Sequence, residues 1–144
     1  MSSKKIVLLL LLGILAVVAL YPLETIVVPE WRIRIVDEAR VPLRNASVRE
    51  VWQHYSIEST DHKEDLLTDG DGFVTFPKRT ITSPLAVRII RAALNSLNPH
   101  GSSGPGAYLV ILARGYDTSS NDAYIPGQPL PTEVVVRKAS QSER

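Results

Sequence analysis

Two lysines near the N-terminus are followed by a long uncharged apolar run, and this segment most constrains what the chain can become. The run extends over Ile6–Tyr21 (IVLLLLLGILAVVALY), directly behind Lys4 and Lys5. A helix that is apolar on every side does not suit the surface of a soluble domain. A full membrane span needs about 20 apolar residues, whereas the core of a signal peptide needs about 7–15. We therefore predict a membrane segment over residues 1–28, with bilayer contact through residues 6–28.

The alternative is a signal peptide that is removed after export. Val17 and Ala19 stand three residues and one residue before a cleavage point at Leu20, which is a tolerable but poor site. Beyond Pro22 and Glu24 the chain is apolar again through residues 25–29, which favours an uncleaved anchor. The lysines precede the apolar run and no comparable cluster follows it, so the positive-inside rule places the N-terminus in the cytoplasm. The remaining chain is expected to be extracytoplasmic, either periplasmic or on the cell surface.

Charge and cysteine usage exclude several classes of protein. The chain has 16 basic and 15 acidic residues, and setting aside Lys4, Lys5 and Glu24 leaves 14 of each. A neutral domain of this kind lacks the clustered basic face that nucleic-acid binding requires. The absence of cysteine excludes disulfides, a thiolate nucleophile and cysteine-ligated zinc. The domain must therefore be stabilised by packing alone.

Residues 29–138 show the pattern of one small β-rich domain, followed by a polar tail over residues 139–144. Alternating apolar and polar residues over 31–37 and 46–55 predict half-buried strands. Asp69-Gly70-Asp71-Gly72 between short apolar runs predicts a hairpin. The apolar run 107–113 predicts a strand buried on both faces, and 132–138 predicts the last strand, whereas 56–65 is expected to be a loop. This pattern favours an all-β, antiparallel sandwich with one inserted helix.

The inserted helix is expected within residues 83–106, with Ser83 as its N-cap and a Gly-rich linker after it. Its apolar residues recur at helical spacing, and polar residues occupy the other side. The stripe either packs on the sandwich and covers strands, or it binds a partner helix or groove. Together with an exposed tyrosine at a strand end, it forms the candidate binding surface: Leu85, Ile89, Ala93, Leu97 and Tyr55.

The region from Ile33 to Phe76 resembles the carboxypeptidase regulatory-like, or transthyretin-like, β-sandwich family. The residues that carry the resemblance are Val36-Asp37, Arg40-Val41-Pro42-Leu43, Asn45-Ala46-Ser47-Val48, Thr68-Asp69-Gly70-Asp71-Gly72 and Phe73-Val74-Thr75-Phe76-Pro77. Arg40 stands where that family often has glycine, and the family pattern does not account for the helix. The resemblance implies seven strands in two sheets and a non-catalytic adhesive or spacer module on an exported protein.

Possible sites of chemistry have weak support in the sequence. His54, His62 and a neighbouring carboxylate such as Asp61 or Glu64 could meet at a metal, but they lack the spacing typical of metal ligands. An EF-hand loop starting at Asp69 would need a glutamate at its twelfth position, where Thr80 stands. The segment 100–104 lacks the spacing of a nucleophile elbow, and the C-terminus lacks the Tyr-Arg-Gly-Ser signature of the 5-hydroxyisourate hydrolases. We therefore predict no catalytic, cofactor or metal residues.

The function expected from the sequence is that of a non-enzymatic, membrane-anchored module of the cell envelope with a structural or protein-binding role. A carbohydrate-binding module is the alternative, because Trp31, Trp52 and Tyr55 could form a platform on which sugars stack. The tryptophans are the better candidates for core positions, and Tyr55 is the better candidate for exposure. A metal-dependent or hydrolytic enzyme is the third interpretation. The partner, whether protein or glycan, is not identified by the sequence.

Overall fold

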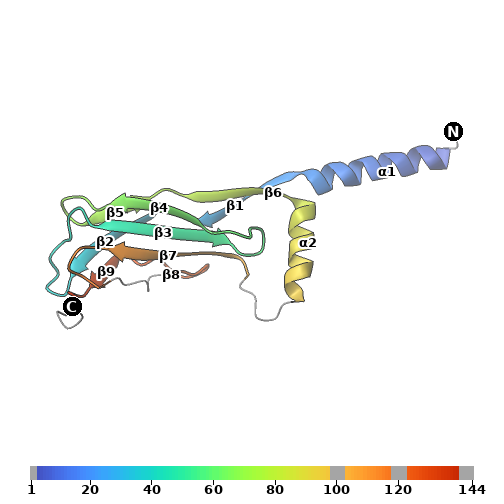
Figure 1. Cartoon of the computed structure of the whole chain (residues 1–144). Coiled ribbons are helices and arrows are strands. Elements are labelled where there is room, and N and C mark those ends of the chain that lie inside the picture. The colour runs from blue at the N-terminus through green and yellow to red at the C-terminus, as the bar shows by residue number, and fades with distance from the viewer. Residues whose placement is uncertain (1–2, 98–102, 118–122, 140–144) are drawn as a thin grey trace.

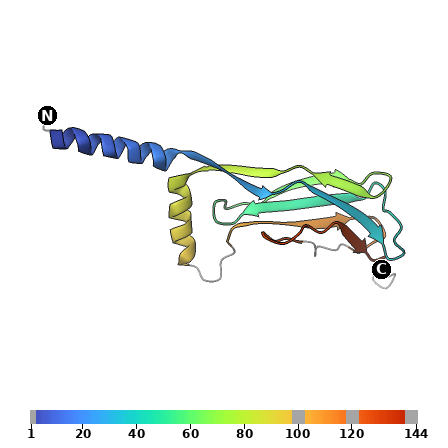
Figure 2. The same cartoon turned by 180° about the vertical axis from the view of Figure 1, so that it is seen from behind.

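The structure, a computed structural model, describes residues 3–97, 103–117 and 123–139. It is mostly β, and a helix projects from one end of the β-rich body (Figures 1 and 2). The described residues form two helices, α1 (Ser3–Leu20) and α2 (Leu85–Ser96). They also form nine strands: β1 (Pro22–Val28), β2 (Trp31–Asp37), β3 (Ser47–His54), β4 (His62–Leu67), β5 (Phe73–Phe76), β6 (Arg79–Pro84), β7 (Pro105–Leu112), β8 (Ala123–Tyr124) and β9 (Glu133–Val136).

Two sheets and a ribbon share one hydrophobic core. One sheet has the order β5-β2-β9, the other has the order β4-β3-β7-β8, and β1 and β6 form a two-stranded ribbon. Alternating residues of β2 point into the core, as the period of two requires. The indole N–H of Trp31 donates to the carbonyl of Pro131 over 2.8 Å, which satisfies its polar atom inside the core. The largest buried apolar side chains are Trp31, Phe76, Ile33, Ile35, Leu109 and Ile111.

The strand predictions are partly confirmed. The strand predicted over residues 31–37 has those bounds in the structure, and strands also lie within 46–55 and 132–138. The purely antiparallel expectation is wrong, because β9 pairs with β2 in parallel. The described residues form nine strands, where seven were expected. The run 107–113 is buried mainly on one face, since Ala107, Leu109 and Ile111 are buried while Tyr108 and Leu112 are exposed. The loop expected over 56–65 ends early, because β4 begins at His62 and pairs with β3.

The turn at residues 69–72 forms as predicted, but its flanking strands do not make a hairpin. Asp69 Oδ1 accepts the backbone N–H groups of Asp71 and Phe73, each over 2.9 Å. β4 pairs with β3, however, whereas β5 pairs with β2 in the other sheet. Gly72 has a φ of 79° and its carbonyl accepts the N–H of Ile35 over 2.8 Å. The turn therefore carries the chain from one sheet to the other.

A second turn, which follows β2, is also held by an aspartate side chain that accepts two backbone N–H groups. Asp37 Oδ1 accepts the N–H groups of Ala39 and Val41, each over 2.9 Å. Between them Arg40 has a φ of 63°, in the left-handed region that favours glycine. The position where the resembled family often has glycine is therefore one where the backbone adopts a positive φ.

The boundary between the apolar helix and the β domain lies earlier than predicted. The helix ends at Leu20, and residues 22–28, assigned by sequence to the membrane segment, form β1. β1 pairs with β6 in antiparallel register, and Val27 and Val28 are buried in the core. Pro22 cannot donate a helical hydrogen bond, and β-branched residues after it suit a strand. The second apolar stretch thus belongs to the domain. The tail expected over 139–144 lies outside the described residues beyond Ala139.

Candidate functional site

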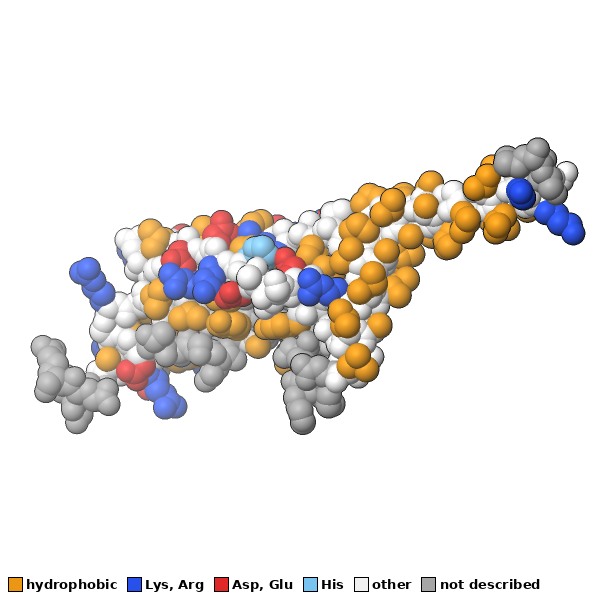
Figure 3. All heavy atoms as spheres, turned by 45° about the vertical axis from the view of Figure 1, so that its right-hand side comes forward, with side chains coloured by type: hydrophobic (Ala, Val, Ile, Leu, Met, Phe, Trp, Pro, Cys, Tyr) orange, Lys and Arg blue, Asp and Glu red, His pale blue; other side chains and the backbone are white. Residues whose placement is uncertain are grey.

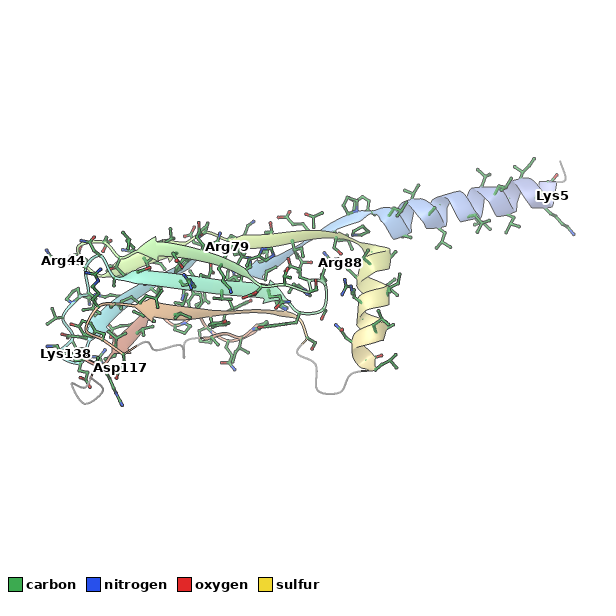
Figure 4. The ribbon with its side chains drawn as sticks, viewed as in Figure 1. Lys5, Arg44, Arg79, Arg88, Asp117 and Lys138 are labelled. Atoms are coloured by element: carbon green, nitrogen blue, oxygen red, sulfur yellow. The ribbon has the colours of Figure 1, made fainter. Side chains whose placement is uncertain are left out.

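The end of the domain where α1 emerges is the first candidate region. None of the residues of α1 is buried, although most of its side chains are large and apolar. The helix is long and apolar enough to cross a membrane, a property that a signal sequence shares. At a rise of about 1.5 Å per residue, its 18 residues extend about 27 Å, close to the roughly 30 Å hydrocarbon core of a bilayer. Lys5 lies at the free end of this helix (Figure 4).

Arg88 holds together the elements that meet where α1 ends. It projects from α2 toward β1 (Figure 4), where its guanidinium donates to Thr25 Oγ1 over 2.5 Å and to the carbonyl of Leu23. Its Nε donates to the carbonyl of Ser83 over 3.3 Å. Arg88 therefore joins α2 to both strands of the ribbon. Arg88 lies on the polar side of the helix, and this side faces the ribbon.

The predicted apolar stripe faces away from the sandwich. Ile89 is 61% exposed and Leu97 is 80% exposed, and α2 has no buried residue. Leu85 and Ala93 also lie on the helix, half-buried and exposed respectively. The interpretation in which the stripe covers the sandwich is therefore contradicted. The N-cap is Pro84 rather than Ser83, which belongs to β6, and no side chain caps the helix.

A cluster of charged and aromatic side chains lies where the ribbon meets β3 and β4. Arg79 Nε donates to Glu50 Oε2 over 2.9 Å, and its Nη2 pairs with Glu64. The Arg79 guanidinium lies 4.1 Å from the centroid of the Trp52 ring, and His62 stacks on the same ring with centroids 5.5 Å apart. Figure 4 shows Arg79 beside the central strands. Trp52, His62 and Arg79 border an open hollow of about 380 Å³.

Burial and ion pairing shift the pKa of the Glu50 carboxyl in opposite directions. The side chain is fully buried, and burial raises the pKa of its carboxyl above the usual value, while the hydrogen bond and charge of Arg79 oppose that rise. Its second oxygen, Oε1, has no hydrogen-bond partner among the described residues. Arg79 thus supplies the neutralising contact for a carboxylate inside the protein. The arrangement stabilises the junction of ribbon and sheet.

Sequence reasoning did not identify this ion pair, although a signal was present. Glu50 shares one face of its strand with Val48 and His54, and all three are buried. An acidic residue on a buried face requires a partner of opposite charge. The alternation puts Glu50 on one face with Val48 and His54 but does not show that this face is buried, and the partner, Arg79, comes from a strand that the sequence did not reveal.

The histidines do not form a metal site in the described part of the chain. No group of three potential ligands gathers anywhere in residues 3–97, 103–117 and 123–139. His54 is buried, and burial lowers the pKa of its imidazole. His62 lies on the surface, where its Nε2 is 2.6 Å from Glu58 Oε1. His100 lies outside the described residues.

The three aromatic residues considered for sugar stacking have different environments. Trp31 is fully buried. Trp52 is half-buried beneath Arg79 and against His62. Tyr55 is 39% exposed and borders a shallow hollow of about 300 Å³ with Tyr108 and Tyr124. The prediction that Tyr55 is the exposed one is confirmed.

No protein-family model and no curated protein sequence matches this chain. Among solved structures, the crystal structure of 3-chlorocatechol 1,2-dioxygenase from Rhodococcus opacus 1CP resembles it with a TM-score of 0.43 and 16% sequence identity. The match covers 76% of this chain and 59% of that chain, so this chain spans less than two thirds of that structure. A likeness of this size supports no inference about activity.

Proposed function

We propose that this chain is a non-enzymatic, single-pass membrane protein whose β domain makes structural or protein-binding contacts on the extracytoplasmic side. The observation that carries the proposal is that no residue of α1 is buried and that its large apolar side chains are exposed. Apolar surface in water costs about 25 cal/mol per Å², so a helix exposed along its whole length needs an apolar environment. A bilayer provides that environment along the whole helix.

The distribution of charge supports the orientation. Lys4 and Lys5 lie at the free end of α1, and the first charged residue after the helix is Glu24. Basic residues near a membrane span favour the cytoplasmic side. The β domain is thereby assigned to the opposite side, in the periplasm or at the cell surface.

The connection between helix and domain supports a structural role. β1 begins at Pro22, two residues after α1 ends, and continues into the core at Val27 and Val28. Arg88 and Arg79 bind the ribbon to α2 and to the four-stranded sheet respectively. A short, hydrogen-bonded link of this kind holds the sandwich at one orientation to the anchor, which suits a spacer or scaffold.

The relation to the carboxypeptidase regulatory-like family is part of the proposal. Two turns that carry the resemblance are built by aspartates that accept two backbone N–H groups each, Asp37 and Asp69. The positive φ of Arg40 also agrees with the glycine common at that position. The modules of that family are usually non-catalytic appendages of exported proteins, and this supports the proposed role.

The anchor predicts how the protein behaves during membrane fractionation. Full-length protein is expected to stay with membranes after washing with high salt, because apolar contact and not charge holds it. Replacing Leu11 and Ile14 together with arginine should release protein from the membrane, since each central arginine costs about 2.5–3.5 kcal/mol of insertion free energy. The matched variant with alanine at both positions should remain bound. Recovery of a soluble mature chain beginning at Leu20 would instead establish a cleaved signal peptide.

A further inference from the structure

Helix α2 is oriented opposite to the usual amphipathic helix on a protein surface. Its polar side faces the domain: Arg88 bonds to the ribbon, and Asn95 is half-buried with its Nδ2 atom out of contact with water. Its apolar side faces away from the domain. The exposed residues of that side are Val87, Ile89, Ile90, Ala93, Leu94 and Leu97. An exposed apolar surface of this extent marks a contact with a partner or with lipid.

The start of α2 is fixed at the level where α1 ends. The N–H of Leu85 donates to the carbonyl of Tyr21 over 3.3 Å, so the first residue of α2 touches the residue that follows α1. Because α1 extends about 27 Å, Tyr21 would lie near the outer boundary of a bilayer spanned by α1. Tyrosine is enriched at that boundary. The first turn of α2 therefore lies at the depth of the membrane interface.

The direction of α2 also fits a membrane surface. It runs crosswise to α1 at the end of the β body from which α1 leaves (Figure 1). Hydrophobic side chains cover the visible side of α2 and continue onto α1 (Figure 3). With α1 along the membrane normal, α2 lies in the plane of the bilayer surface, and the two helices share one apolar environment.

The charges of α2 suit phospholipid headgroups. Within Leu85–Ser96 the charged residues are Arg88 and Arg91, and there is no acidic residue. Arg91 is exposed, and at helical spacing it follows the exposed Val87. An arginine at the edge of an apolar face can extend its charged head into the headgroup layer while its stem stays in apolar surroundings.

From these observations we infer that α2 is an interfacial helix that lies on the outer bilayer surface and inserts its apolar side among the lipids. This inference rests on the proposed membrane anchor. The bound occupant is the phospholipid bilayer itself. With two apolar elements in one membrane and Arg88 bonded to the ribbon that connects them, the domain is held at a fixed tilt to the bilayer. The role of a binding surface, predicted for Leu85, Ile89, Ala93 and Leu97, is thus assigned to lipid contact.

Lipid contact can be measured on the full-length protein, because the chain has no cysteine of its own. Single variants Ile90→Cys and Leu94→Cys would carry an environment-sensitive fluorophore in vesicles of phosphatidylcholine with a minority of phosphatidylglycerol. Leu12→Cys in α1 and Thr75→Cys on β5 are the matched controls. We expect lipids with a spin label high on the acyl chain to quench the fluorophores at residues 90 and 94. Aqueous iodide should quench these two fluorophores several-fold less than it quenches the fluorophore at residue 75.

Two results would overturn the assignment of α2 while leaving the anchor intact. In both, the label at residue 12, near the middle of α1, is quenched by lipids whose spin label lies deep in the acyl chain. If the labels at 90 and 94 are then quenched by iodide, α2 lies in water. If neither quencher reaches them, protein covers the helix, either a second copy or another chain. Failure of lipid to quench the label at residue 12 would contradict the anchor itself.

Discussion

Replacing Arg79 with methionine is expected to lower the free energy of unfolding by about 3–5 kcal/mol at neutral pH, the usual cost of removing one partner of a buried ion pair. The cause is Glu50, which is fully buried and would keep its charge without a counterion. The methylene groups of Arg79 are largely retained by methionine, so packing over Trp52 is disturbed less than charge. Urea denaturation of the full-length protein in detergent measures the loss.

The loss caused by Arg79→Met should depend on pH in a defined direction. Burial already raises the pKa of the Glu50 carboxyl above its ordinary value of 4.5, and removal of Arg79 takes away the opposing contact. When a carboxyl has a higher pKa in the folded state than in the unfolded state, its protonation stabilises the folded state. This stabilisation is complete below the unfolded-state pKa and is lost as the pH rises through the folded-state pKa. The gap in stability between variant and parent should therefore narrow as the pH falls toward 4.5.

A second substitution separates charge from packing. Glu50→Gln in the Arg79→Met background should restore most of the lost stability, because the uncompensated charge is gone. Arg49→Met is the matched control, because Arg49 pairs with Asp65 in an exposed position. The change in the free energy of unfolding that this substitution causes should be within experimental error. A loss that is the same at every pH and is not restored by Glu50→Gln would show that Arg79 acts through packing.

Gly72→Ala is expected to be the second strongly destabilising change, whereas Gly70→Ala, two residues away, should be nearly neutral. Gly72 has a positive φ, which costs a residue with a side chain about 1–3 kcal/mol. A Cβ at this position would also lie 2.7 Å from the backbone oxygen of Ile35 and 3.0 Å from Cβ of Pro42. Ile35 belongs to the core strand β2 and Pro42 to the turn that follows it, so moving either of them away from an added Cβ would lower the stability of the fold.

The comparison with Gly70 isolates the conformational requirement. A Cβ at Gly70 meets nothing within 4 Å, and its φ is not in the left-handed region. Thermal unfolding of both variants under identical conditions measures the difference. Equal melting temperatures would contradict the close contact between the turn and β2, and with it the crossover from one sheet to the other.

Local pattern was sufficient to predict those elements whose residues alternate or recur regularly. Within the strand 31–37, buried apolar residues alternate with arginines from Trp31 to Ile35, and the helix after Pro84 has a clear helical period. The turn at residues 69–72 was predictable because its aspartate and glycines form the same contacts wherever they occur. Each of these signals is local, so no knowledge of distant partners was needed.

The errors arose where the outcome depends on distant residues. Apolar content alone does not separate a helix end from the buried strand at Val27 and Val28. A turn does not reveal whether its two strands pair with each other or with other strands. The period of α2 revealed the apolar stripe, but Arg88 decides that the polar side faces the domain. The Glu50–Arg79 pair likewise required two segments distant in sequence.

Membrane topology tests the central claim most directly. Single cysteines at Ser3 and at Thr75 would report the two sides of the bilayer, because Ser3 begins α1 and Thr75 is exposed on β5. In right-side-out membrane vesicles, a membrane-impermeant maleimide should label Thr75→Cys at once and Ser3→Cys only after the vesicles are permeabilised. Labelling of Ser3→Cys in closed vesicles while Thr75→Cys is protected would contradict an extracytoplasmic β domain held by an N-terminal anchor.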